Sequence, residues 1–172
     1  MLAFQIMNGL TFAALLFVVA SGFTLIFGLL RIVNLAHGAL YLFGGYIGFT
    51  FGKMTDSFVI AGLSAMLSVA VMGLVLDQGL LRFVRGYDLR QVMLTLGVAF
   101  VLNDLALVIW GGDTFTVATP AFLQGAVVLG PLFYPKFRVF VLVIGIAVFI
   151  SLWLLLNKTR LGALIRAGVD DL

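Results

Sequence analysis

The feature that most constrains this sequence is a series of apolar runs, each long enough to cross a lipid bilayer. The first uncharged run extends from Phe4 to Leu30. A bilayer core is about 30 Å thick, so a helix needs about 20 mostly apolar residues to cross it. Because backbone polar groups in lipid must be satisfied within the protein, runs of this kind predict α-helices. We therefore expect an all-α, polytopic transmembrane helix bundle.

Composition supports a membrane protein and argues against several other classes. Hydrophobic side chains make up 63% of the 172 residues and charged ones 10%, whereas soluble domains are about 25% charged. With no cysteine and one histidine, His37, disulfides, thiolate chemistry and a multi-histidine metal site are not expected. No catalytic residue or cofactor site is expected either, because no phosphate-binding glycine–lysine loop or nucleophile–base set occurs. The basic residues end apolar runs, which indicates contact with lipid headgroups and not with nucleic acid.

Four polar interruptions divide the chain into five expected spans. Basic residues in short loops favour the cytoplasm, and a split of seven against three predicts an outer N-terminus and a cytoplasmic C-terminus. Residues 1–172 are expected to form a single transmembrane domain that is incomplete at its C-terminal end. The expected spans are residues 4–30, 32–51, 58–81, 92–110 and 137–156. The inner basic residues are Arg31, Arg82, Arg85, Arg90, Lys158, Arg160 and Arg166, and the outer ones Lys53, Lys136 and Arg138.

The second expected span carries small and polar residues along one helical stripe. Small residues let membrane helices approach closely, and Gly44, Gly48 and Gly52 repeat at four-residue spacing. The other side of this span, with Leu40 as an example, suits lipid or apolar packing. The stripe is interpreted as a structural seam or as the lining of a translocation path. It consists of Asn34, Gly38, Tyr41, Gly45, Gly48 and Gly52.

Three polar residues within the spans are candidates for function. Asn103 and Asp104 lie near the expected membrane middle, where an aspartate costs about 2.5–3.5 kcal/mol on insertion scales unless it has a partner. A role in transport and a polar clamp between helices both stay open, and the partner would be a hydroxyl, an amide, water or another subunit. His37 lies six residues after Arg31, which favours a cap on a helix-end loop over a proton relay.

Residues at the ends of the spans give two further expectations. Asp77 is followed by Arg82 and Arg85, which favours an ion pair or a headgroup contact. The outer loop 111–136 is rich in aromatic residues, and this favours a loop held at the headgroup level over a contact surface for an external partner. Its aromatic residues are Phe115, Phe122, Phe133 and Tyr134.

One segment carries a family resemblance. Residues 22–41, Gly-Phe-Thr-Leu-Ile-Phe-Gly-Leu-Leu-Arg-Ile-Val-Asn-Leu-Ala-His-Gly-Ala-Leu-Tyr, resemble the N-terminal signature of the permease subunits of branched-chain amino acid ABC transporters. Residues 96–97, 103–111 and 159–171 resemble later parts of that pattern in the same order. Asn103-Asp104 stands where the family more often has Gln-Asn, and Asp77-Gln78 is a weaker match to its usual Glu-Arg.

The resemblance implies a permease subunit of an ATP-driven importer in the bacterial inner membrane, with ATP bound by separate subunits. Implied partners are a second permease, cytoplasmic ATPases and a periplasmic binding protein, and implied solutes are branched-chain amino acids, other amino acids, urea or amides. An ion-coupled transporter or channel that uses Asp104, and a non-transporting scaffold, are the competing hypotheses. Path or helix-interface candidates are Asn34, His37, Gly38, Tyr41, Gly45, Gly48, Asn103 and Asp104; ATPase-coupling candidates are Arg160, Gly162, Arg166, Asp170 and Asp171.

Overall fold

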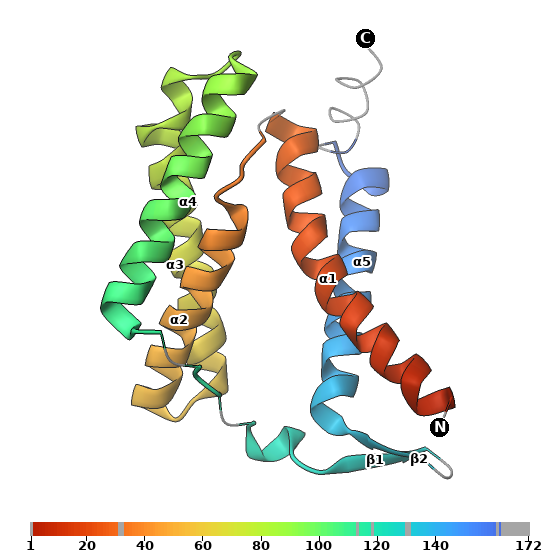
Figure 1. The fold of residues 1–172 in the computed structure, drawn as a ribbon. Coiled ribbons are helices and arrows are strands. Elements are labelled where there is room, and N and C mark those ends of the chain that lie inside the picture. Colours follow the sequence, from red (N-terminus) through yellow and green to blue (C-terminus); the bar gives the residue numbers. More distant parts are fainter. Residues whose placement is uncertain are drawn as a thin grey trace. The chain divides into compact units, whose positions relative to one another are not determined.

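A computed structural model describes residues 2–30, 33–112, 114–117, 119–129, 132–160 and 162. The helices are α1 (Leu2–Leu30), α2 (His37–Thr55), α3 (Phe58–Gly79), α4 (Asp88–Trp110) and α5 (Lys136–Lys158), and the shorter elements are η1 (Leu81–Phe83), η2 (Ala121–Leu123), β1 (Ala126–Leu129) and β2 (Leu132–Pro135) (Figure 1). Two compact units result. The three-helix unit (residues 30–120) holds α2, α3 and α4, and the α1–α5 unit (residues 1–29 and 121–172) holds the rest.

The helices confirm the all-α membrane class. Among the described residues, α1, α3, α4 and α5 supply the helical segments that are long and apolar enough to cross a membrane. Helix α2 lies where the second span was expected but does not belong to this set, because glycines and polar residues interrupt its aliphatic ones. Its predicted start at Ile32 was wrong, since the helix begins at His37 after a turn over residues 33–36. The orientation across the membrane stays a prediction.

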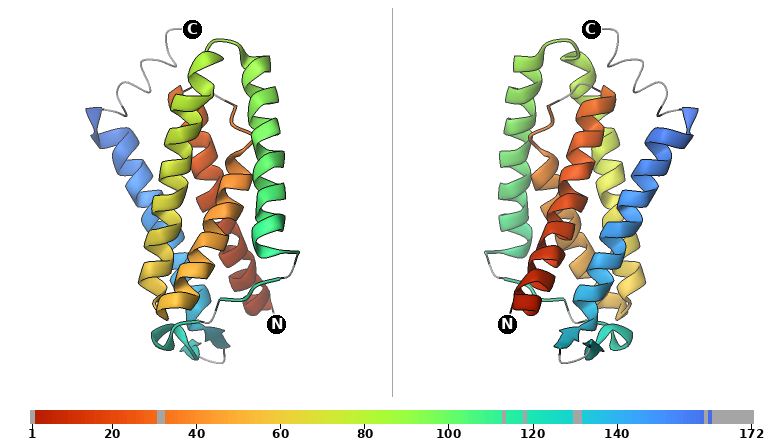
Figure 2. Two further views of the ribbon diagram at one scale, coloured as in Figure 1. Left: turned by 90° about the vertical axis from the view of Figure 1, so that its left-hand side faces the viewer. Right: turned by 90° about the vertical axis from the view of Figure 1, so that its right-hand side faces the viewer.

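In the three-helix unit, α2 contacts both α3 and α4, and it lies beside them in the views of Figure 2. The contact with α3 is a glycine seam, which we define as Gly44, Gly48 and Gly52. A Cβ atom added to Gly48 would lie 3.0 Å from the Ala61 carbonyl oxygen and 3.1 Å from the Ala65 Cβ. The seam therefore brings two backbones together more closely than larger side chains would allow.

The predicted stripe on α2 is only partly covered within the three-helix unit. Gly48 and Gly52 face α3, but an added Cβ at Gly38 or Gly45 would meet no atom within 4 Å. Tyr41 is 60% exposed. Leu40, on the side expected to suit lipid or apolar packing, is buried at 6% exposure and so packs within the protein. The close contact follows the line through Gly44, which lies about 100° around the helix from Gly45.

In the α1–α5 unit, a short hairpin precedes α5, although no strand was expected there. β1 and β2 are antiparallel, with Val128 opposite Phe133. Gly125, just before β1, has a φ of 87°, a left-handed conformation that glycine adopts without steric cost. The hairpin thus begins where the chain can turn freely.

Tyr134 on β2 is packed against α1. Its hydroxyl lies 2.7 Å from Thr11 Oγ1 and 2.9 Å from the Met7 carbonyl oxygen, and its ring meets that of Phe4 edge to face. Tyr134 is 1% exposed, so the expected headgroup position was wrong for this residue, whereas Phe133 is exposed. A buried phenol needs a polar partner for its hydroxyl, and Thr11 on α1 supplies one.

The glycine seam gives a prediction on stability. Gly48→Leu should destabilise the protein, because the side chain would be forced into Ala61 and Ala65, and such overpacking costs about 1–3 kcal/mol. Gly45→Leu is the matched control, since open space surrounds that position. Thermal unfolding in detergent measures both variants. Equal melting temperatures for the two would show that the α2–α3 contact does not carry the fold.

Candidate functional site

The turn that leads into α2 is built around Asn34. The Asn34 side-chain oxygen accepts a hydrogen bond from the Ala36 backbone N–H at 3.0 Å, and the Asn34 carbonyl accepts one from the His37 N–H at 3.2 Å. Asparagine favours such turns because its side chain can bond to the backbone two residues ahead. Asn34 is 5% exposed and Ala36 fully buried. Two residues of this turn are therefore buried within the protein, whereas Leu35 between them is 41% exposed.

Thr95 on α4 holds this turn in place, a role that sequence reasoning missed. Its hydroxyl oxygen accepts a hydrogen bond from the Leu35 N–H at 3.1 Å and lies 2.8 Å from the Gln91 carbonyl oxygen. Thr95 is completely buried. The sequence did contain an indication of this role, because Gln91 and Thr95 are polar residues four positions apart in an apolar helix. Polar side chains within a span usually face the protein interior.

His37 is the first residue of α2 and is half-buried. The interpretation of His37 as a cap on a helix-end loop requires a position at a helix end, and His37 has such a position. Its function stays a prediction.

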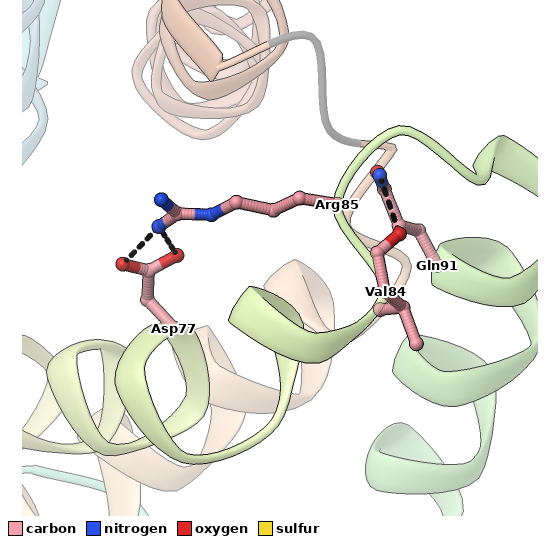
Figure 3. Close-up of polar contacts among 4 residues, drawn as sticks. All are labelled: Asp77, Val84, Arg85 and Gln91. Atoms are coloured by element: carbon pink, nitrogen blue, oxygen red, sulfur yellow. Dashed lines mark hydrogen bonds and ion pairs between the residues drawn. The ribbon is translucent and has the colours of Figure 1, made fainter.

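The turn between α3 and α4 confirms the predicted ion pair. Arg85 Nη2 lies 2.8 Å from both carboxylate oxygens of Asp77, and the Gln91 side-chain nitrogen donates to the Val84 carbonyl at 3.2 Å (Figure 3). The Arg85 side chain is 55% exposed, and exposed pairs contribute about 0–1 kcal/mol. The hydrogen bond of the buried Gln91 side chain contributes more to the stability of this turn than the ion pair does. Leaving a buried polar group without its hydrogen bond costs about 1–3 kcal/mol.

Asp104 and Asn103 lie on an open face of α4. Both are exposed, and the Asp104 carboxylate has no hydrogen-bond or ion-pair partner within the described part of the chain. Asp104 follows Thr95 by nine residues, about two and a half helical turns, and so faces away from the side that holds the turn into α2. The neighbouring Val108 is 84% exposed. The structure therefore separates Asp104 from the Asn34 turn.

The other end of α4 carries aromatic contacts that also were not expected. The Trp110 indole N–H donates to the Thr50 hydroxyl at 2.8 Å, and its ring stacks on Tyr46. Phe115, from the loop after α4, contacts Phe49 with ring centroids 4.7 Å apart. Helix α2 is thus tied to α4 near both ends, by Thr95 at one and by Trp110 at the other.

The ATPase-coupling candidates lie at the end of the chain. Arg160 is exposed, and the Gly162 N–H donates to the Thr159 hydroxyl at 3.3 Å. An added Cβ at Gly162 would overlap the Leu156 carbonyl group. Arg166, Asp170 and Asp171 lie outside the described residues. No group of three histidine, cysteine or acidic side chains that could hold a metal ion occurs in the described ranges.

Comparison with known proteins identifies the family. The model of a family described as "branched-chain amino acid transport system / permease component" matches residues 5–171. The high-affinity branched-chain amino acid transport system permease protein BraD of Pseudomonas aeruginosa is 27% identical over 183 residues, and LivH of Salmonella typhimurium and of Escherichia coli K12 are each 25% identical over 183 residues. Each alignment covers 98% of this chain and 59% of the relative. No solved structure matches significantly.

A permease component is a transport subunit of the bacterial inner membrane and not an enzyme, and the four long apolar helices found among the described residues agree with that location. The chain spans 59% of the length of these curated relatives. Because the family match extends over nearly the whole sequence, the chain belongs to the permease component family of branched-chain amino acid transport systems.

Proposed function

We propose that this chain is a membrane permease subunit of an ATP-driven importer that moves branched-chain amino acids or a related small polar solute. The observation that carries the proposal is the family match over residues 5–171. The relatives BraD and LivH, which are permease proteins of high-affinity branched-chain amino acid transport systems, support this solute class. ATP would be bound and hydrolysed by separate subunits.

Helix α2 is the element that we propose to line the translocation path. The glycine seam attaches it to α3, and Thr95 and Trp110 attach it to α4. Gly38, Tyr41 and Gly45 are left uncovered within the three-helix unit. A path for an aliphatic amino acid must accept a charged backbone group and a branched side chain, and a glycine-lined face with a phenolic hydroxyl fits both needs.

The proposed partners are a second permease subunit, cytoplasmic ATPases and a periplasmic binding protein. The open face of α4 supports a partner within the membrane, because an unpartnered aspartate facing lipid costs about 2.5–3.5 kcal/mol on insertion scales. We propose that protein of the assembled transporter, with an amide or hydroxyl group opposite Asp104, covers this face. Arg160 and Gly162, together with Arg166, Asp170 and Asp171, are proposed to couple the permease to the ATPase.

The relatives do not support an ion-coupled mechanism through Asp104, since BraD and LivH are permease proteins of branched-chain amino acid transport systems. In such a mechanism the coupling ion would bind an ionised carboxylate. The asparagine variant of Asp104 therefore discriminates between the two transport classes.

The first test is reconstitution of the complete transporter in liposomes with the binding protein outside and ATP inside. Leucine uptake should require ATP hydrolysis and should continue after ionophores collapse the proton and sodium gradients. A variant ATPase that binds ATP without hydrolysing it is the control, and it should abolish uptake. Uptake that follows an ion gradient without ATP would refute the importer proposal.

The turn into α2 gives a second prediction. Thr95→Val keeps the side-chain shape but removes the acceptor of the part-buried Leu35 N–H, and a typical intramolecular hydrogen bond contributes about 0.5–1.5 kcal/mol. We expect a lower melting temperature and reduced leucine uptake. Thr95→Ser is the matched control, because it retains the hydroxyl and should keep most of both properties. If valine and serine behave alike, the hydroxyl does not hold the turn.

Asp104 gives a third prediction. Asp104→Asn should retain ATP-dependent uptake, because an amide can still hydrogen-bond to a partner subunit. Asp104→Leu should reduce the amount of second permease that co-purifies with the tagged chain. Val108→Leu, an apolar exchange on the same exposed face, should leave co-purification unchanged. Full assembly with the leucine variant would show that no polar contact with the second permease is made at this position.

A further inference from the structure

A cavity of about 410 Å³ opens in the three-helix unit where α2 ends and α3 begins. The loop that follows α4 forms its other wall. Binding sites for small molecules are about 300–1,000 Å³ in volume, so the space suits a small solute. It is lined by Phe49, Gly52, Lys53, Asp56, Ser57, Phe58, Ala61, Thr116, Val117, Thr119 and Pro120.

Two opposite charges line this cavity without neutralising each other. Lys53 lies in the last turn of α2, and Asp56 is the residue that ends the helix. Neither side chain has an ion-pair or hydrogen-bond partner among the residues that the structure describes. Asp56 has a φ of 49°, the one left-handed non-glycine backbone found in the described ranges. Both charges thus remain available to a third group.

The remaining walls are largely apolar. Phe49 and Phe58 supply aromatic surface, and Ala61 and Val117 supply aliphatic surface. Val117 is 50% exposed, so the cavity is accessible from solvent. Burial of aliphatic groups contributes about 25 cal/mol per Å² of apolar surface removed from water. The cavity therefore combines one cation, one anion and a surface that favours a branched hydrocarbon.

We propose that this cavity is an entrance site for a zwitterionic amino acid with an aliphatic side chain. The solute carboxylate would accept charge-assisted hydrogen bonds from the Lys53 ammonium, and the solute ammonium would donate to the Asp56 carboxylate. Its side chain would lie against Phe49, Phe58 and Val117. The predicted orientation puts this end of α2 outside. The proposal rests on the proposed function, because it locates where the imported solute first meets the permease.

The test uses Val117→Cys in the complete transporter, held in lipid nanodiscs so that reagents reach both faces. Residues 1–172 contain no cysteine, so once any cysteines elsewhere in the transporter are replaced, a maleimide reagent reports on this position alone. Leucine should slow labelling about tenfold at about ten times its dissociation constant. Val128→Cys, an exposed hairpin position outside the cavity, is the matched control and should be labelled at an unchanged rate.

The dependence of this protection on charge shows which groups of the solute the cavity recognises. Lys53→Met and Asp56→Asn, each combined with Val117→Cys, should remove the protection by leucine. Isoamylamine and 4-methylpentanoate each lack one charge of leucine and should protect less. Labelling that leucine does not slow, protection that survives both substitutions, or equal protection by the solute-free binding protein would each overturn the entrance site. ATP-dependent leucine uptake is measured in parallel, so failure of the proposed function is seen separately.

Discussion

The fold depends on how helices associate in lipid, where no hydrophobic driving force brings them together. Lipid tails are as apolar as leucine, so association relies on close packing and on hydrogen bonds between helices. In the three-helix unit the close packing comes from the glycine seam against Ala61 and Ala65. Because the backbones approach so closely there, α2 has a fixed position from which the turn at its beginning and the cavity at its end can be built.

The same solvent explains why single polar side chains have large structural roles. The turn over residues 33–36 is not helical, so its backbone groups need partners from elsewhere. Asn34 supplies one partner within the turn, and Thr95 supplies another from α4. In the α1–α5 unit, Tyr134 and Thr11 satisfy each other in a comparable way. The Thr95 and Tyr134 contacts join segments that are distant in sequence and so help to fix how those segments pack.

The segments α1, α3, α4 and α5 were predictable, because the length of an apolar run directly reflects bilayer thickness. The repeat of Gly44, Gly48 and Gly52 also indicated the seam. The start of α2 was not predictable from hydropathy, because Ile32 and Val33 are as apolar as a helix requires and the turn arises from hydrogen bonds to Thr95. The position of Tyr134 was predicted wrongly because an aromatic residue in a loop can face either lipid headgroups or protein. The hydroxyl of Thr11 on α1 is the partner that favours the protein interior.

The charged residues differ in whether this chain supplies a partner for them. Asp77 and Arg85 form an ion pair with each other beside the turn between α3 and α4. Among the residues that the structure describes, Lys53 and Asp56 have no partner at the cavity, and Asp104 has none on its apolar helix. An unpaired charge in water costs little, but one at membrane depth must be met by another group. For this reason the proposed function gives the charges at the cavity to a solute that binds and leaves, and gives Asp104 a permanent neighbour in the assembled transporter.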